Sequence, residues 1–304
     1  MKKLLPQAEL AQFARSRAER REVVVGNGKT AFWFYPAANG SSKAKSLVMI
    51  HGYRGNHHGL EAIAGAITDM DVYIPDLPGF GQSEPLTSEH TIEHYADWLD
   101  GFLQALKLKQ KPHLLGHSFG SIVVSKYAAE HDGIATLILE NPVAAPALKG
   151  PKALTTAVTK AFFWLAGALP NSIGSSILKS WPMVRGMSII MTKSREAELR
   201  RWVHRQHDDN FNDFANRRVA LEGYNASISN CVGDFAPQFK VAVLMLVGER
   251  DDITTVAQQK KLFNLLPSEG CEYRQFAGVG HLTHYEIPSK IAGEIEHWVV
   301  NSNV

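Results

Sequence analysis

Short apolar runs alternate with amphipathic segments along most of this chain. The runs fall at 46–52, 71–79, 112–118, 134–142, 241–251 and 272–281. Continuous apolar runs bounded by turn residues are typical of strands buried on both faces, as in a parallel sheet. Helices are predicted between or after them, at 91–108, 119–131, 254–266 and 288–300. This alternation predicts an α/β fold with a mainly parallel sheet, whose ligand site lies beyond the carboxyl ends of the strands.

Two regions depart from the alternation. Near the amino terminus, a charged helix-like segment at 8–20 precedes two β-rich runs, 21–25 and 31–37, which a Gly-Asn-Gly turn joins into a hairpin. Between Pro142 and Pro237 there is no strand pattern, and helices are predicted at 152–168, 173–191, 195–209 and 213–230. A run of helices inside an α/β rhythm indicates an inserted cap. We therefore expect a core made of 1–142 and 238–304 and a helical cap made of 143–237.

Composition narrows the class of protein. The 304 residues are 45% hydrophobic, which suffices for one large core with an insertion. Lys and Arg number 32 against 30 Asp and Glu, so no nucleic-acid partner is expected. Two cysteines without a C-x-x-C motif fit a reducing compartment. No apolar stretch is long enough to span a membrane, and Pro6 and Glu9 interrupt any signal-like start, so a cytoplasmic location is expected. The oligomeric state is not indicated.

The pentapeptide Gly116-His117-Ser118-Phe119-Gly120 reads G-x-S-x-G. A chance match to this pattern in a chain of this length has a probability of roughly one in ten, so the context must decide. Ser118 follows a predicted strand and precedes a predicted helix, as a nucleophile elbow requires. Such a turn strains the serine backbone and places its hydroxyl near a helix N-terminus. The sequence thus predicts Ser118 as a nucleophile.

A serine nucleophile needs a histidine base, and the base needs a carboxylate to fix its tautomer. His281 lies in a glycine-containing loop just after the last predicted strand, and Asp251 lies just after the preceding one. Both loops belong to the same edge of the sheet as Ser118. Asp252 is expected to cap the helix that begins near Thr254. Glu140, at the end of another strand, remains an alternative acid.

With these motifs the chain resembles a capped member of the α/β-hydrolase superfamily. The motifs are HGYRG (51–55), DLPGFGQSE (76–84), GHSFG (116–120), GERDD (248–252) and GVGHLTHYE (278–286). The resemblance implies an eight-stranded, mainly parallel sheet flanked by helices, with a cap between strands six and seven. It implies a triad in the order Ser118, Asp251, His281. It also implies an oxyanion hole formed by the backbone amides of Tyr53 and Phe119.

The resulting hypothesis is a cofactor-independent serine hydrolase that cleaves small to medium, fairly apolar carboxylic esters through an acyl-enzyme on Ser118. The same triad serves C–C bond hydrolases of ring-cleavage products, lactonases and thioesterases, and a non-catalytic ligand receptor on this fold is a further alternative. No metal site is expected, because the histidines at 51, 57 and 58 lack a carboxylate partner in sequence. His117 is expected to be a neighbour of the site and not its base, and the nearby His284 is expected to be an ordinary loop or helix-start histidine. No individual substrate-binding residue is predicted.

Overall fold

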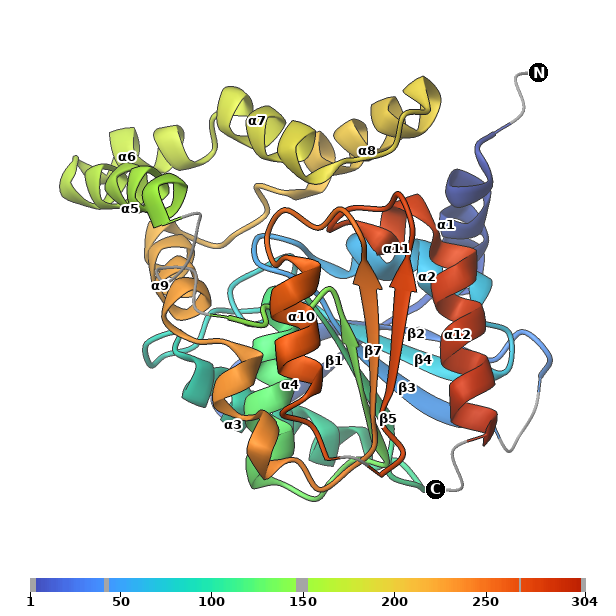
Figure 1. Ribbon diagram of the computed structural model, residues 1–304. Helices are drawn as coiled ribbons and strands as arrows, with labels where there is room; N and C mark the ends of the chain where they lie inside the picture. The colour runs from blue at the N-terminus through green and yellow to red at the C-terminus, as the bar shows by residue number, and fades with distance from the viewer. Residues whose placement is uncertain (1–3, 41–43, 146–152, 268, 302–304) are drawn as a thin grey trace.

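An eight-stranded sheet runs through the centre of the molecule in the order β1-β2-β4-β3-β5-β6-β7-β8 (Figure 1). The computed structural model describes residues 4–40, 44–145, 153–267 and 269–301. The strands are β1 (Glu19–Val25), β2 (Gly28–Tyr35), β3 (Lys45–Ile50), β4 (Met70–Pro75), β5 (His113–His117), β6 (Thr136–Glu140), β7 (Val243–Gly248) and β8 (Glu272–Phe276). The β1–β2 and β2–β4 pairs are antiparallel and the other pairs are parallel. The predicted hairpin and the mainly parallel sheet are confirmed.

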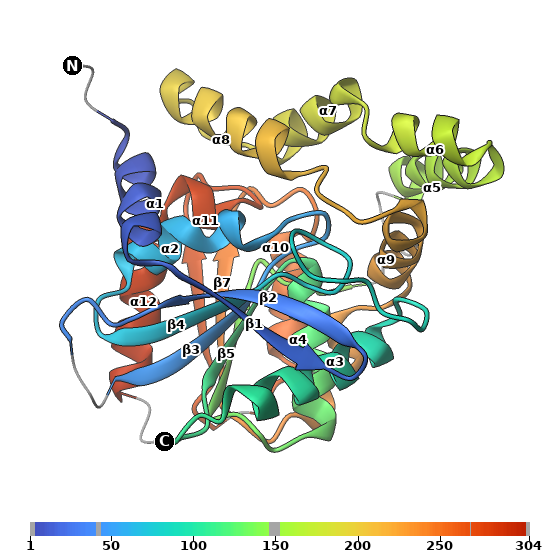
Figure 2. The ribbon, with the colours of Figure 1, turned by 180° about the vertical axis from the view of Figure 1, so that it is seen from behind.

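Helices cover both faces of the sheet, as Figure 2 shows from behind. On one face lie α1 (Pro6–Arg17), α2 (Glu61–Ala66) and α12 (Pro288–Asn301), which bury side chains such as Ile63 and Trp298 against the strands. On the other face lie α3 (Ile92–Leu106), α4 (Phe119–Glu130) and α10 (Val256–Phe263). Since both faces are covered, the central strands β5, β6 and β7 are buried along their whole length and are mainly apolar, and this continuity made them predictable.

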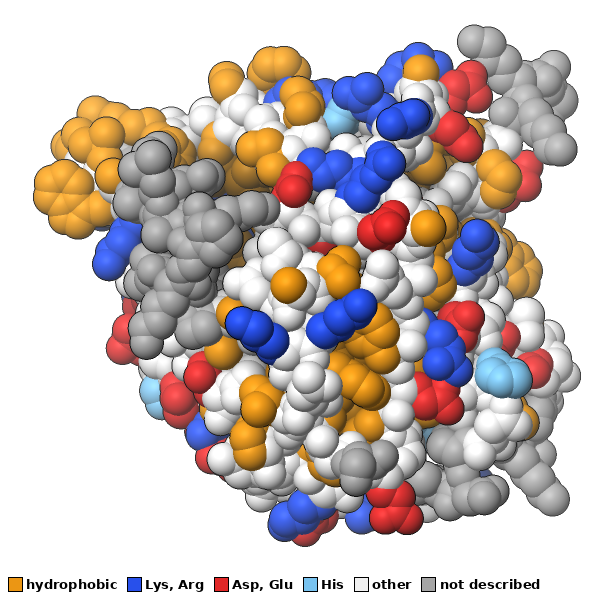
Figure 3. Space-filling view, viewed as in Figure 1, with side chains coloured by type: hydrophobic (Ala, Val, Ile, Leu, Met, Phe, Trp, Pro, Cys, Tyr) orange, Lys and Arg blue, Asp and Glu red, His pale blue; other side chains and the backbone are white. Residues whose placement is uncertain are grey.

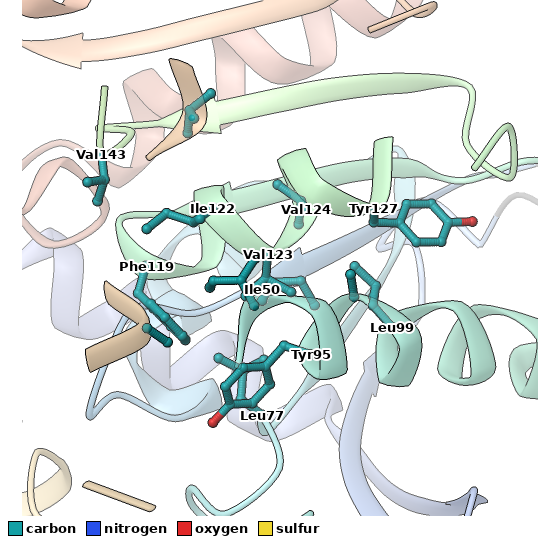
Figure 4. Close-up of a cluster of buried hydrophobic side chains, with 14 of the residues drawn as sticks. Ile50, Leu77, Tyr95, Leu99, Phe119, Ile122, Val123, Val124, Tyr127 and Val143 are labelled. Carbon is teal, nitrogen blue, oxygen red and sulfur yellow. The ribbon is translucent and has the colours of Figure 1, made fainter. Parts of the chain in front are cut away.

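Helix α4 is buried between the sheet and α3 (Figure 4). Its side chains Phe119, Ile122 and Val123 are at most 1% exposed and belong to the same cluster as Ile50 of β3 and Tyr95 of α3. Nine of the twelve residues of α4 are buried, as expected for a helix that is enclosed on most of its sides. The packing therefore fixes the position of the helix that begins immediately after Ser118.

Five helices occupy the segment predicted as a cap: α5 (Ala153–Ala168), α6 (Asn171–Leu178), α7 (Trp181–Met191), α8 (Ala197–Asn210) and α9 (Arg217–Ser229). Helices α5 to α8 lie beyond the edge of the sheet toward which the β7 and β8 arrows point in Figure 1. The division at residues 142 and 237 stays a prediction, and residues 146–152 lie outside the described residues.

The single helix predicted at 173–191 is wrong, because the structure has two helices there, α6 and α7. The chain breaks at Lys179 and Ser180, and Pro182 occupies the first turn of α7. Proline has no N–H for an intrahelical hydrogen bond and is tolerated at a helix start, where that donor has no partner in any case. Pro182 therefore begins a new helix and does not continue the old one.

The outer surface of the cap carries large hydrophobic side chains, which gather over α5 and α6 in Figure 3. Trp164 of α5 is 71% exposed and Trp181 of α7 is 60% exposed, whereas Phe163 of α5 is buried. Helix α5 is therefore apolar on both its inner and outer sides. Among the described residues, no helix combines the length and hydrophobicity needed to span a bilayer.

Candidate active site

Ser118 is the single residue between the end of β5 and the start of α4, and its backbone is strained, with φ 51° and ψ −118°. Non-glycine residues reach positive φ only at a cost of about 1–3 kcal/mol, which the surrounding structure must offset. Two hydrogen bonds hold this turn: the Ser118 amide donates to the Glu140 carbonyl over 3.1 Å, and the Ser121 amide donates to the Ser118 carbonyl over 2.9 Å. The half-buried hydroxyl is thereby presented at the carboxyl edge of the sheet.

The two glycines of the pentapeptide permit close backbone contacts around this turn. A Cβ on Gly120 would lie 2.3 Å from the carbonyl oxygen of Ile50, and a Cβ on Gly116 would lie 2.6 Å from the carbonyl oxygen of Gly120. Real Cβ atoms do not approach backbone that closely. Both positions therefore require glycine so that helix α4 can pack directly against strands β3 and β5.

His281 and Asp251 complete the arrangement that the strand ends predicted. The Nε2 atom of His281 lies 2.8 Å from the Ser118 hydroxyl oxygen, and its Nδ1 atom lies 2.8 Å from Oδ2 of Asp251. His281 and Asp251 are 3% and 4% exposed. This geometry has Nδ1–H donating to the carboxylate, so Nε2 is free to accept the serine proton. The structure thus brings together the three residues expected to form the triad.

The second oxygen of Asp251 fixes the carboxylate. Its Oδ1 atom accepts hydrogen bonds from the backbone amides of Ile253, over 2.7 Å, and Thr254, over 3.2 Å. The expectation that Asp252 caps the next helix is wrong. Thr255 caps α10, and the side chain of Asp252 forms an ion pair with Lys193, between the cap helices α7 and α8.

The loop after β3 contributes Tyr53, and α4 contributes Phe119, the two residues expected to supply oxyanion-hole amides. Both line the cavity that contains Ser118, and their rings meet edge to face with centroids 6.2 Å apart. Among the described residues, no acceptor takes either backbone amide. The Tyr53 hydroxyl donates to the carbonyl of Ala220 in α9 over 2.5 Å, so its side chain packs under the cap.

His51 holds the loop after β3, which carries Tyr53, through two hydrogen bonds. Its Nε2 atom accepts a hydrogen bond from the Leu77 amide over 2.9 Å, and its Nδ1 lies 2.9 Å from the Gly52 carbonyl, to which it donates. Burial lowers the pKa of His51, which keeps the ring neutral and allows this pattern. His57 turns away to the buried carboxylate of Asp76, 2.9 Å from Nδ1. His51 therefore has a structural role in the loop.

Arg54 is a residue whose role the sequence did not reveal. It is fully buried, with φ 63°, and connects the Tyr53 loop to the cap. Its Nη2 donates to the Leu178 carbonyl over 2.8 Å, and its Nε donates to the Phe211 carbonyl over 3.1 Å. These contacts span more than a hundred residues of sequence, which no local pattern can indicate. Burial lowers the pKa of Arg54, the direction expected for a cation removed from water.

Glu140 was the alternative acid. Among the described residues, no hydrogen bond or ion pair joins it to His281. It lies fully buried at the end of β6, where its Oε1 accepts the Thr283 hydroxyl. His117 and His284 lie beside it. Burial lowers the pKa of both imidazoles, that of His284 to about 3, so both remain neutral. His284 was expected to be an ordinary helix-start residue, but it is 4% exposed and belongs to this buried cluster.

Ser118 and His281 line one cavity of about 260 Å³ between the core and the cap, and Asp251 contacts His281 without lining it. Its walls are mainly apolar, with contributions from Phe163, Met187, Met191, Tyr224, Ile228 and Leu282. Among the aromatic side chains of the cap, Phe163 lines the cavity, whereas Trp202 packs edge to face on Tyr285 of α11 (Thr283–Glu286). No Asp, Glu, Lys or Arg is among the described residues that line this cavity.

The chain is similar to several known proteins. The family model described as serine aminopeptidase, S33 matches residues 41–288. The chain is 23% identical over 295 residues to "Lipase 1" of Psychrobacter immobilis, covering 91% of this chain and 84% of that protein. It is 24% identical over 291 residues to "Monoglyceride lipase" of Rattus norvegicus, covering 91% and 89%. The structure of an esterase from Exiguobacterium antarcticum superposes with a TM-score of 0.75 at 18% identity, covering 93% of this chain and 100% of that one.

Proposed function

Because the chain belongs to the serine aminopeptidase S33 family of the α/β-hydrolase superfamily and is similar to two lipases over most of its length, we propose that it hydrolyses carboxylic esters through an acyl-enzyme on Ser118. The observation that carries this proposal is the continuous hydrogen-bonded arrangement of Ser118, His281 and Asp251, with 2.8 Å at each step. Ser118 and His281 of this arrangement line a cavity with mainly apolar walls.

In the first half of the reaction, the Ser118 oxygen attacks the ester carbonyl carbon while His281 Nε2 takes the hydroxyl proton. Asp251 stabilises the resulting imidazolium through Nδ1. The backbone amides of Tyr53 and Phe119 are placed to donate to the oxygen that becomes negative, and each such donor is worth about 3 kcal/mol of barrier. Collapse of the tetrahedral intermediate breaks the C–O bond, and His281 gives its proton to the leaving alcohol.

In the second half, a water molecule replaces the alcohol. His281 takes a proton from the water, the resulting hydroxide attacks the acyl carbon, and the proton returns to the Ser118 oxygen as the carboxylic acid leaves. The barrier therefore depends on the same groups in both halves, and the enzyme needs no cofactor.

The cavity favours an ester over a peptide with a free amino terminus. An aminopeptidase must bind the ammonium group of its substrate, and a carboxylate is the natural partner for that charge. The described residues along the cavity include none, and its apolar walls suit an acyl chain of small to medium size. The names of the two lipase relatives point in the same direction.

The proposal is tested by measuring kcat/KM for p-nitrophenyl acetate, butyrate, octanoate and palmitate, with an aminoacyl p-nitroanilide for comparison. We expect the butyrate or octanoate ester to exceed the palmitate ester by at least about tenfold, since the enclosed volume limits the chain length. Ser118→Ala should lower turnover by a factor of at least about 10,000. Faster cleavage of the anilide than of every ester, or retained turnover in Ser118→Ala, would contradict the proposal.

A further inference from the structure

A second cluster of ionisable side chains lies directly beneath Ser118 and is not used by the proposed reaction. His117 ends β5, Glu140 ends β6, and His284 lies in α11. Their side chains converge: His117 Nδ1 lies 3.5 Å from Glu140 Oε2, and His284 Nδ1 lies 3.5 Å from Glu140 Oε1. One potential ligand atom from each residue lies within 4.8 Å of the other two. All three residues are buried, with exposed fractions of 6%, 0% and 4%.

The converging atoms have no hydrogen-bond partners. His117 Nδ1, His284 Nδ1 and Glu140 Oε2 are inaccessible to solvent and make no hydrogen bond to any described residue. Only Glu140 Oε1 has one, from the Thr283 hydroxyl. Buried polar atoms are normally paired, and a native structure rarely leaves one without a partner. Three such atoms from three separate elements, directed at one another, indicate a missing partner common to all of them.

The chemistry of the three atoms identifies that partner. Two imidazole nitrogens and one carboxylate form a donor set that proteins use for Zn²⁺, at bond lengths of roughly 2.0–2.2 Å. In a tetrahedral site with such bonds, neighbouring ligand atoms lie roughly 3.3–3.5 Å apart. Each imidazole nitrogen lies at about this spacing from a different oxygen of the carboxylate: His117 Nδ1 is 3.5 Å from Oε2 of Glu140, and His284 Nδ1 is 3.5 Å from Oε1. We propose that His117, Glu140 and His284 bind one Zn²⁺ ion, which enters from the substrate cavity.

Both histidines line the substrate cavity, so the cluster adjoins it. A neutral imidazole is the form that binds metals. A ring that carries its proton on Nε2 presents its Nδ1 lone pair toward Glu140, and an ionised carboxylate favours a divalent cation.

A second group of similar composition provides a contrast. His57, His58 and Glu61 also bring ligand atoms together. There, however, His57 Nδ1 bonds Asp76 over 2.9 Å, His58 Nδ1 bonds Glu61 over 3.0 Å, and Arg15 Nε donates to the same carboxylate over 2.7 Å. Its atoms are already paired, and a metal would have to displace Arg15. We therefore assign the site to the cluster under Ser118 and use His58 as a control.

An ion in this position would act on the reaction as an inhibitor. The rings of His117 and His281 lie 5.3 Å apart between centroids. His281 must acquire a positive charge when it takes the Ser118 proton, and a dication beside it opposes that charge. This consequence rests on the proposed function, whereas binding of the ion does not.

The binding test is isothermal titration of the EDTA-treated, dialysed protein with zinc sulfate. We expect one tight equivalent in the wild type, in His58→Gln and in His281→Ala. Glu140→Gln and His284→Gln should each weaken it by more than about tenfold, since removing even an outer partner of a metal ligand costs 10- to 100-fold. Equal affinity in the wild type and in both of these variants would overturn the proposal. Loss of the site in His281→Ala alone would place the ion on the triad and overturn it as well.

A measurement on the wild type keeps the proposal testable if a variant fails to fold. X-ray absorption at the zinc edge should show two imidazole ligands at about 2.0 Å, whereas a triad-bound ion would show one. A single imidazole contradicts the proposal.

Inhibition is a separate readout: stoichiometric zinc should lower kcat for p-nitrophenyl butyrate, and EDTA should restore it. Tight binding without inhibition would keep the site and refute only the effect on His281, whereas an inactive metal-free enzyme would refute the proposed function alone.

Discussion

Asn141 donates a hydrogen bond from its side-chain amide to the backbone carbonyl of His281 over 2.8 Å. The same nitrogen lies 2.7 Å from the Thr283 hydroxyl, and its Oδ1 accepts the Gly248 amide over 2.7 Å. Asn141 is fully buried and has φ 42°. One side chain at the end of β6 therefore joins the loop that carries His281 to the end of β7, close to Asp251. It is a positioning residue for the candidate triad.

Removing that side chain should misplace the base. Asn141→Gly leaves the Gly248 amide and the His281 carbonyl without their partner, and glycine tolerates the positive φ. We expect a loss of about 2–4 kcal/mol in the free energy of unfolding, measured by urea denaturation. The kcat for p-nitrophenyl butyrate should fall more than KM rises, because the transition state depends on the position of His281. An unchanged kcat would show that the loop is held by other contacts.

The nucleophile turn should not tolerate a methyl group at Gly120. Gly120→Ala places a Cβ against the carbonyl oxygens of Ile50 and His51, at 2.3 and 2.6 Å. Backbone cannot yield as a flexible side chain does, so the variant should lose about 1–3 kcal/mol or more of stability together with its activity. Gly293→Ala in α12 is the matched control, since a Cβ there meets nothing within 4 Å. It should keep full activity and gain about 0.5–1 kcal/mol. Equal thermal stabilities of the two variants would refute the steric account.

Arg54 should couple the oxyanion loop to the cap. Arg54→Lys loses the planar fork that reaches the carbonyls of Leu178 and Phe211 at the same time. We expect a lower melting temperature, a reduced kcat, and faster hydrogen exchange in α6 and in the loop at Phe211. Arg20→Lys, at a 47% exposed side chain in β1, is the control and should change none of these. Unaltered exchange in the cap of Arg54→Lys would contradict the coupling.

Stability should fall in acid partly because of His113, far from the candidate active site. His113 is 2% exposed, and burial, with a smaller effect from Lys45, lowers its pKa to about 4. In the unfolded chain an ordinary histidine has a pKa of about 6.5. Between these two values the unfolded state binds the additional proton, so this contribution is present above pH 6.5 and is lost as the pH falls toward 4.

The measurement is the free energy of unfolding at several pH values across that window. Replacing His113 by Asn should reduce the slope by up to about 1.4 kcal/mol per pH unit, which corresponds to one proton. Other buried histidines, such as His207 with its pKa lowered to about 3, leave part of the slope in place. An identical slope in the wild type and the variant would mean that His113 is not held neutral.

The sequence predicted most of the core because its signals are local. Buried parallel strands are continuous apolar runs, and each predicted run contains or overlaps a strand in the structure. The meeting of Ser118, Asp251 and His281 was also predictable, since the carboxyl ends of parallel strands share one edge. The break at Pro182 was missed, although proline in a helical pattern signals a new helix start.

Contacts between distant segments could not be read from the sequence. Arg54 in HGYRG looks like a surface arginine until the cap covers it, and Glu140 looks like a strand-end carboxylate until His117 and His284 surround it. Such relationships depend on how elements pack, and packing leaves no periodic signal along the chain. For the same reason the lining of the substrate cavity was not predicted residue by residue.

The most direct test of the central claim is covalent labelling of Ser118. The folded protein is treated with a fluorophosphonate, and the adduct is located by mass spectrometry of the intact chain and of its peptides. We predict one adduct per chain, on Ser118, that forms only in the folded protein, at a rate matched by the loss of ester hydrolysis. His281→Ala should label far more slowly. If hydrolysis is abolished while Ser118 carries no adduct, or persists after Ser118 is fully labelled, Ser118 is not the nucleophile.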